Sequence, residues 1–233
     1  MRNISPDSNL FKYKTIPFYG RTLDEYKRFF QLKPEELIGK KVLDTPSGAS
    51  SFVSEACKMG IEAVACDLVF DEDIDTLSQY GKDDIDHVIE KVTANMDLFK
   101  WEFYDSLQHL KECRTKAFTN FISDYKENRN RYVKAELPHL PFEDNSFHLA
   151  LSGHFLFTHS HSLDYNFHLQ TITELFRVAN QVRIYPLVEL NTKLYHKMDQ
   201  LFEDLKDKGA TCQIIPVDFE FQKGANEMLL LTH

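Results

Sequence analysis

Hydrophobic positions along this chain follow two spacings, one typical of strands and one typical of helices. Residues 41–44 (KVLD) and 62–67 (EAVACD) are short apolar runs that each end in an acidic residue, which predicts two buried strands. Between them an apolar stripe at helical spacing runs from Phe52 to Met59, and Gly60 marks the end of that helix. The segment therefore predicts a strand, a helix and a second parallel strand, joined by a right-handed crossover.

The alternation of the two spacings continues through the rest of the chain. A helix is predicted at residues 22–32, and apolar positions within residues 71–130 mark two more. Further strands are predicted at residues 131–135, 147–152, 182–187, 213–217 and 227–231, and further helices at residues 167–179 and 194–205. The pattern predicts an α/β fold in which helices cover both faces of a mostly parallel sheet.

The chain divides into a short N-terminal part and one larger domain. We expect residues 1–36 to form a lid and a helix, and residues 37–233 to form the α/β domain, with a helical cap inserted at about residues 71–130. With 233 residues, of which 42% are hydrophobic, the chain is long enough to bury a full core in one domain.

Charge and composition exclude several classes of protein. The 27 Lys and Arg residues against 36 Asp and Glu residues give a formal net charge of -9, which argues against a nucleic-acid partner. No window approaches the roughly 20 apolar residues of a membrane span, so we expect a soluble cytoplasmic protein without a membrane partner. The four cysteines lie far apart and form no C-x-x-C pair, which predicts reduced thiols.

The candidate chemistry lies at the carboxyl ends of the predicted strands, where open α/β sheets bind ligands. Residues 44–50 (DTPSGAS) form a turn of small residues that opens with a carboxylate, which suits a ligand with a cationic group better than a pyrophosphate. Asp67 ends the second strand, 23 residues after Asp44, where an acid can accept hydrogen bonds from two ribose hydroxyls. The alternatives are an ordinary tight turn and a solvated acid. Together the two positions favour an adenosine-type ligand.

Four features of the sequence carry a family resemblance. They are VLDTPSGAS, the strand-terminal Asp67, LPFEDNSFHLALSGHFLF and ELFRVA, and they resemble the class I S-adenosylmethionine (SAM)-dependent methyltransferases over about residues 37–233. The resemblance is to a poorly characterised branch in which a Pro-Ser-Gly loop replaces the glycine-rich motif. It implies a Rossmann-like class I methyltransferase fold with a seven-stranded sheet, SAM as cofactor and S-adenosylhomocysteine (SAH) as product.

The resemblance also implies a cofactor site at the strand ends. The residues that it places against the cofactor are Asp44, Thr45, Pro46, Ser47, Gly48, Asp67, Leu68, Glu136, Leu137, Ser152, Gly153 and His154. Within this set Asp67 would hold the ribose hydroxyls, Leu68 would cover one face of the adenine, and Glu136 would face the adenine amino group.

Residues near the cofactor site are candidates for the acceptor and for proton transfer. Tyr19 and Arg21 precede the first helix, where related enzymes place a lid, and His159 follows the fourth strand. His154 begins the same loop and is the candidate catalytic base. The alternative is that His154 only packs in the core or binds the cofactor.

Two clusters of residues have simpler explanations than a binding site. His159, His161, Asp164 and His168 fall within ten residues, but their spacing matches no common zinc pattern, so we predict no metal site. Seven cations lie in or next to the predicted cap and would suit an anionic substrate or RNA, but acidic residues between them favour a solvated helix face. These cations are Lys111, Arg114, Lys116, Lys126, Arg129, Arg131 and Lys134.

The sequence therefore predicts a SAM-dependent methyltransferase that acts on an unidentified small or medium-sized acceptor. One alternative is a non-catalytic SAM- or adenosine-binding protein that regulates or partners another protein. Another is an RNA-modifying enzyme or RNA-binding protein, which rests on the basic stretch and the aromatic residues near it.

Overall fold

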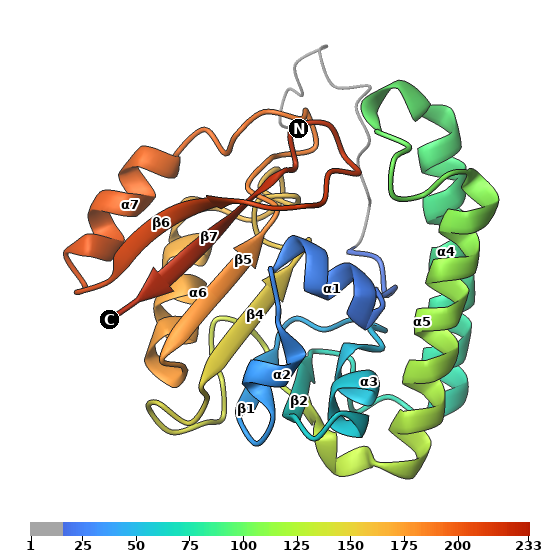
Figure 1. The fold of residues 1–233 in the computed structure, drawn as a ribbon, viewed down its shortest axis with the longest axis horizontal. Coiled ribbons are helices and arrows are strands. Elements are labelled where there is room, and N and C mark those ends of the chain that lie inside the picture. Colours follow the sequence, from blue (N-terminus) through green and yellow to red (C-terminus); the bar gives the residue numbers. More distant parts are fainter. Residues whose placement is uncertain (1–15) are drawn as a thin grey trace, which may run out of the picture.

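A seven-stranded sheet organises the computed structural model, which describes residues 16–233 (Figure 1). The strand order is β3-β2-β1-β4-β5-β7-β6. Among the described strands only β7 runs opposite to the others, so its pairings with β5 and β6 are antiparallel. The strands are β1 (Lys41–Asp44), β2 (Glu62–Asp67), β3 (Tyr132–Lys134), β4 (Leu149–Gly153), β5 (Gln181–Tyr185), β6 (Thr211–Pro216) and β7 (Glu227–Thr232).

Helices cover both faces of this sheet. They are α1 (Leu23–Phe29), α2 (Pro34–Leu37), α3 (Phe52–Lys58), α4 (Ile74–Ala94), α5 (Leu107–Glu127), α6 (Tyr165–Val178) and α7 (Met198–Lys206), with short 3-10 turns η1 (Met96–Leu98) and η2 (Arg129–Arg131). Successive residues of β1 point to opposite faces, so Val42 packs in the core under α1, α3, α4 and α5, while Leu43 packs in the core under α6 and α7. The α/β fold predicted from the sequence is confirmed.

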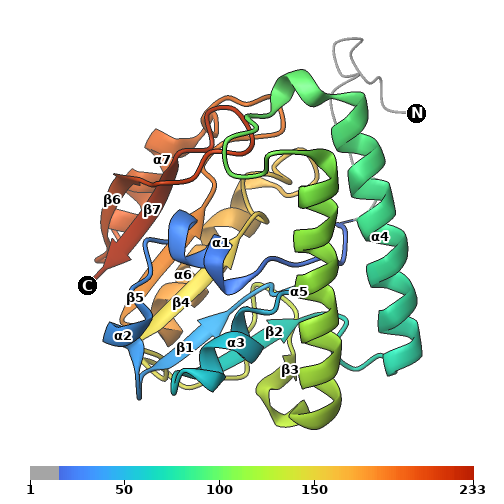
Figure 2. The same ribbon diagram turned by 45° about the vertical axis from the view of Figure 1, so that its right-hand side comes forward.

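Two helices are predicted within residues 71–130, and two are observed there, α4 and α5, which run 21 residues each. Figure 2 shows α5 beside α3 and α4 on its outer side. The two helices approach closely at Gly81, where an added Cβ would lie 2.1 Å from a ring carbon of Phe118. The insertion therefore extends the helical layer over β2 and β3, and one of its ends reaches the carboxyl ends of the strands.

Several sequence predictions can be compared directly with the observed elements. The bounds predicted for β1 and β2 are those observed, and all four cysteines are free thiols as predicted. The helix predicted at residues 194–205 is wrong at its start, because α7 begins at Met198 and Leu194 is 46% exposed. The short helix α2, which has Pro34 in its first turn, was not predicted.

Two sequence predictions concern the N-terminal segment and the membrane. Residues 1–15 of the predicted lid lie outside the described part of the structure. Among the helices of residues 16–233, none is long and apolar enough to cross a bilayer.

Candidate functional site

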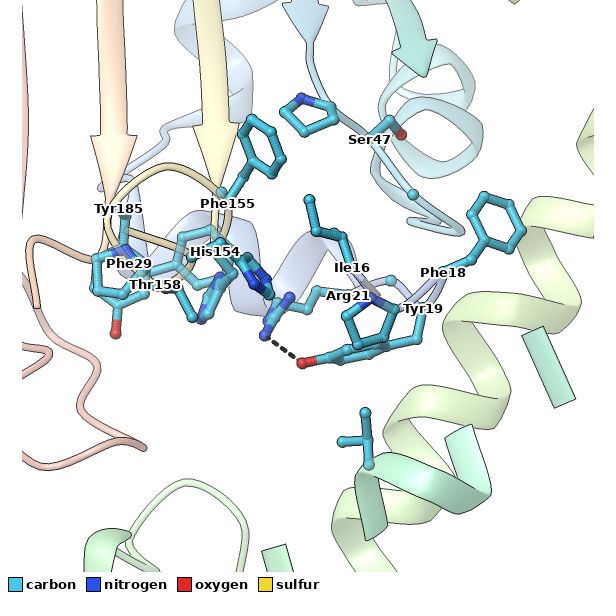
Figure 3. Close-up of a pocket in the computed structure, with 18 of the residues that line it drawn as sticks. Ile16, Phe18, Tyr19, Arg21, Phe29, Ser47, His154, Phe155, Thr158 and Tyr185 are labelled. Atoms are coloured by element: carbon cyan, nitrogen blue, oxygen red, sulfur yellow. Dashed lines mark hydrogen bonds between the residues drawn. The ribbon is translucent and has the colours of Figure 1, made fainter. Parts of the chain in front are cut away.

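A cavity of about 390 Å³ lies at the carboxyl ends of β1, β2 and β4. Its volume falls within the range of about 300 to 1,000 Å³ that small-ligand sites occupy. Its walls come from the loops that follow these strands, from facing ends of α4 and α5, and from residues 16–21, which we call the strap (Figure 3). The sequence-predicted residues that line it are Tyr19, Arg21, Thr45, Pro46, Ser47, Gly48, Asp67, Leu68, Glu136, Leu137, Gly153, His154 and His159.

Two predicted cofactor residues, Asp44 and Ser152, do not line the cavity and are buried behind its wall. Both carboxylate oxygens of Asp44 lie 3.0 Å from the Tyr26 hydroxyl, which donates to them. Burial raises the pKa of Asp44 to about 7, although the hydrogen bond from Tyr26 opposes that rise. Asp44 therefore links β1 to α1, and the ligand contacts predicted for these two residues have no support in this arrangement.

Asp67 is oriented by backbone amides at the wall of the cavity. Its carboxylate accepts hydrogen bonds from the amide of Gly48 at 2.8 Å and from the amide of Val69 at 3.3 Å. Burial raises the pKa of Asp67, and these amides oppose the rise because they favour the charged form. The bond to Gly48 ties the end of β2 to the loop after β1, so the two predicted ligand-binding loops form one unit.

The strap packs directly on the loop after β1. The backbone oxygen of Arg21 accepts from the Ser50 hydroxyl at 3.0 Å and from the Ser51 amide at 3.1 Å. A Cβ on Gly20 would lie 2.1 Å from backbone atoms of Ala49 and Ser50, so only glycine allows this approach. On the other side, the amide of Phe18 donates to Asp84 of α4 at 2.6 Å. The strap is therefore fixed to both walls of the cavity.

Gly48 allows the second close approach, and a matched pair of variants tests it. Gly48 has φ +54°, and its Cβ would lie 2.9 Å from the Tyr19 carbonyl oxygen, whereas Gly39 has φ +69° with no atom within 4 Å. We expect Gly39→Ala to lower the free energy of unfolding by about 1 kcal/mol through backbone strain, and Gly48→Ala by about 2 to 3 kcal/mol through strain and overpacking. Urea unfolding measures both. Equal losses in the two variants would show that the Tyr19 contact is unimportant.

His154 has an unusual backbone and a buried ring. Its φ is +55°, in the left-handed region, and such strain is concentrated at functional sites. The ring lies edge-on to Phe29 and Tyr185, with centroids 5.1 Å and 5.0 Å away, and its buried Nδ1 has no hydrogen-bond partner among the described residues. Burial, and then the positive charge of Arg21, lowers the pKa of His154 well below its usual value. The ring is therefore neutral, and its Nδ1 can take part in a hydrogen bond.

The other histidines of this loop differ in role. His159 is 4% exposed and lines the cavity, and burial lowers its pKa to about 4. His168 packs on Phe157, and its ring nitrogens lie 2.6 Å and 3.0 Å from the backbone oxygens of Asp164 and Leu156. No three histidine, cysteine or acidic side chains of residues 16–233 are grouped so that they could hold a metal ion. The histidine cluster is thus divided: His159 lines the cavity, His168 lies in the core and His161 is exposed.

Sequence reasoning missed a buried ion pair beside the cavity. Arg114 of α5 donates to Glu25 of α1 at 2.6 Å and to the Tyr104 hydroxyl at 2.7 Å, and Tyr104 also donates to Glu25. Arg114 and Tyr104 line the cavity, and Glu25 is 0% exposed. The available signal was the position of Arg114 on the apolar stripe of its helix, four residues after Leu110 and four before Phe118.

The basic stretch is largely neutralised by carboxylates. Four of its cations form ion pairs, at distances of 2.5 to 2.7 Å. The pairs are Lys111 with Asp86, Arg114 with Glu25, Arg131 with Asp124, and Lys134 with Asp71. This arrangement gives no support to an RNA-docking face on the insertion.

Comparison with known proteins places the chain in a family. No family model matches it. It is 34% identical over 220 residues to the uncharacterized protein MJ0045 from Methanocaldococcus jannaschii, and the match covers 94% of this chain and 96% of that protein. The chain belongs to the MJ0045 family.

The fold of this MJ0045-family chain is similar to those of solved methyltransferase structures. A SAM-dependent methyltransferase from Aquifex aeolicus is 15% identical with a TM-score of 0.43, and the match covers 90% of this chain and 95% of that one. A putative RNA methyltransferase from Pyrococcus horikoshii is 11% identical with a TM-score of 0.48, over 97% and 94% of the two chains. The seven-stranded, mostly parallel sheet with one antiparallel strand is the Rossmann-like α/β fold that the sequence predicts.

Proposed function

We propose that this protein is a SAM-dependent methyltransferase with a small or medium-sized acceptor. The observation that carries the proposal is the convergence of three loops on one cavity: the small-residue loop after β1, the Asp67 loop after β2 and the His154 loop after β4. Ligands of open α/β sheets bind at this edge, near the point where the strand order reverses. Here the order reverses between β1 and β4.

The residues that line one end of the cavity suit the adenosine part of SAM. The carboxylate of Asp67 is held by two amides at the cavity wall, which suits an acceptor for ribose hydroxyls. Leu68 and Leu137 offer apolar surface for the adenine ring, and Leu68 is 51% exposed. Glu136 lines the same end and can accept from an amino group.

The other end of the cavity suits methyl transfer. SAM supplies an already activated methyl group, so the protein has to orient a nucleophile and exclude water. The rings of Phe29 and Tyr185 stack 4.8 Å apart at this end and make an apolar wall. His154 stands against that wall, and its Nδ1, which has no partner within residues 16–233, can form a hydrogen bond to the acceptor.

A thermal-shift titration with SAM and SAH tests the proposal. At a hundredfold excess over the dissociation constant, binding adds about 2.7 kcal/mol, which is about 5 to 10 °C for a domain of this size. Asp67→Asn removes the charged acceptor and should weaken SAH binding by about 1.5 to 3 kcal/mol. The matched control is Glu72→Gln, because Glu72 is exposed and does not line the cavity.

Three outcomes of this titration are informative. A shift that Asp67→Asn reduces and Glu72→Gln retains supports the site. No shift with either ligand, or an equal shift in both variants, contradicts it. If SAM binds but no acceptor in a broad screen is methylated, the non-catalytic SAM-binding alternative is favoured.

A further inference from the structure

The cavity is lined by a cation, Arg21, that forms no ion pair within residues 16–233, although its charge helps to lower the pKa of the buried Glu25. The lining cations are Arg21 and Arg114, and Arg114 is already paired with Glu25. Within residues 16–233 no carboxylate lies within ion-pair distance of Arg21. Its guanidinium lies 5.1 Å from the ring centroid of Tyr19 and donates to the Tyr19 hydroxyl at 3.3 Å, which is a long contact.

Part of the hydrogen-bonding capacity of Arg21 is also unused. Its Nε is buried and has no hydrogen-bond partner among the described residues. A buried donor without a partner is costly, and one that belongs to a charged group more so. A guanidinium presents its donors as a planar fork that matches a carboxylate. The unused donors of Arg21 therefore match an anionic group of this shape.

The surroundings of Arg21 define the rest of the ligand. Figure 3 shows Arg21 between Tyr19 and the side chains of the loop after β4, including His154 and Thr158. His154 Nδ1 and Thr158 Oγ1 are also buried without partners in the described part of the chain. Phe29 and Phe155 line the same region. Within the described residues, this end of the cavity thus combines one cation without an ion pair, two polar atoms without hydrogen-bond partners and an aromatic wall.

We propose that Arg21 anchors the carboxylate of a ligand bound in this cavity. Two sources share that chemistry: the amino-acid carboxylate of SAM and SAH, and a carboxylate on a flat acceptor that packs on the aromatic wall. The assignment of either source rests on the proposed function, whereas the carboxylate anchor itself rests on the geometry around Arg21.

Paired ligands and matched variants separate the two sources. Calorimetry compares SAH with 5'-methylthioadenosine, which lacks the amino-acid carboxylate, on wild type, Arg21→Gln and Arg28→Gln. Ligand-observed NMR on the same proteins, with and without SAH, compares benzoate and 2-naphthoate with their amides. Arg28 is a suitable control because it lies outside the cavity, on the exposed face of α1, with 47% of its side chain exposed.

If Arg21 holds the cofactor carboxylate, Arg21→Gln weakens SAH about 10- to 100-fold and leaves methylthioadenosine unchanged. If it holds an acceptor carboxylate, SAH binding is retained and the preference for the aromatic acids over their amides falls by a similar factor. Arg28→Gln should change neither. Arg21→Lys keeps the positive charge but lacks the planar pair of donors, so its affinity for the carboxylate should lie between those of the wild type and Arg21→Gln. This variant also tests the anchor if Arg21→Gln folds poorly.

The proposal and the proposed function fail in different ways. The carboxylate anchor would be contradicted if Arg21→Gln kept the wild-type preference for SAH over methylthioadenosine and for the aromatic acids over their amides. Absence of SAH binding in the wild type would overturn the proposed function. In that case a preference for aromatic acids that depends on Arg21 would still support the carboxylate anchor.

Discussion

Replacing Arg114 by methionine is expected to lower the free energy of unfolding by about 3 to 5 kcal/mol. Glu25, its partner at 2.6 Å, is 0% exposed and would keep a buried charge without its cation. Although burial alone would raise the pKa of Glu25, the Arg114 guanidinium holds it below its usual value. The pair also fastens α1, which carries the strap, to α5, so its loss should loosen the cavity wall.

Urea unfolding at neutral pH measures this loss, and two further variants interpret it. Lys111 lies one turn before Arg114 on α5 and forms an exposed ion pair with Asp86 of α4. Lys111→Met removes that pair and should lower the free energy of unfolding by no more than about 1 kcal/mol. Glu25→Gln combined with Arg114→Met removes both charges and should recover part of the loss. A loss for Arg114→Met as small as that for Lys111→Met would mean that the buried pair contributes little.

The free energy of unfolding of the wild type, minus that of Asp44→Asn, is expected to fall by on the order of 3 to 4 kcal/mol as the pH rises from 4 to 8. Asp44 is 0% exposed, and its pKa is raised from the model-peptide value of 3.8 to about 7. Between these two values the folded state binds a proton that the unfolded state has released. Stability from this group is therefore present at low pH and is lost as the pH rises through about 7.

Unfolding curves of the wild type and Asp44→Asn across this pH range measure the effect. The difference between the two proteins reports Asp44 together with its charge interaction with Asp67, because more distant titrating groups contribute equally to both. The exposed control Glu72→Gln should track the wild type within about 0.5 kcal/mol at every pH. Parallel profiles for the wild type and Asp44→Asn would show that Asp44 ionises in the folded state as it does in the unfolded chain.

The strands that carry the site were predictable because their signals are local. Both β1 and β2 are apolar runs that end in an acid. Strands that are buried on both faces of a sheet consist mainly of apolar residues, so such a run is recognisable in the sequence. The start of α7 was not predictable by spacing alone. Leu194 and Tyr195 continue the helical period, but Val188 pairs with Leu194 in an isolated bridge, and Thr192 takes a left-handed φ of +65°.

The candidate site was predictable to a similar extent. Residues that follow a strand, such as Asp67 and His154, reach the cavity because the sheet edge brings strand ends together. Contacts between distant segments were not predictable. Tyr26 and Asp44 are 18 residues apart, and Glu25 and Arg114 are 89 apart, so no local pattern reports that they meet.

A crystal structure of the protein with SAH tests most directly whether this cavity is a SAM site. We expect SAH in the cavity at the carboxyl ends of β1, β2 and β4, with the Asp67 carboxylate within hydrogen-bond distance of both ribose hydroxyls. We also expect the adenine beside Leu68 and the sulfur toward the side of His154. At saturating SAH, a cavity without the ligand, or a ligand bound elsewhere on the protein, would contradict the assignment of this cavity as a SAM site.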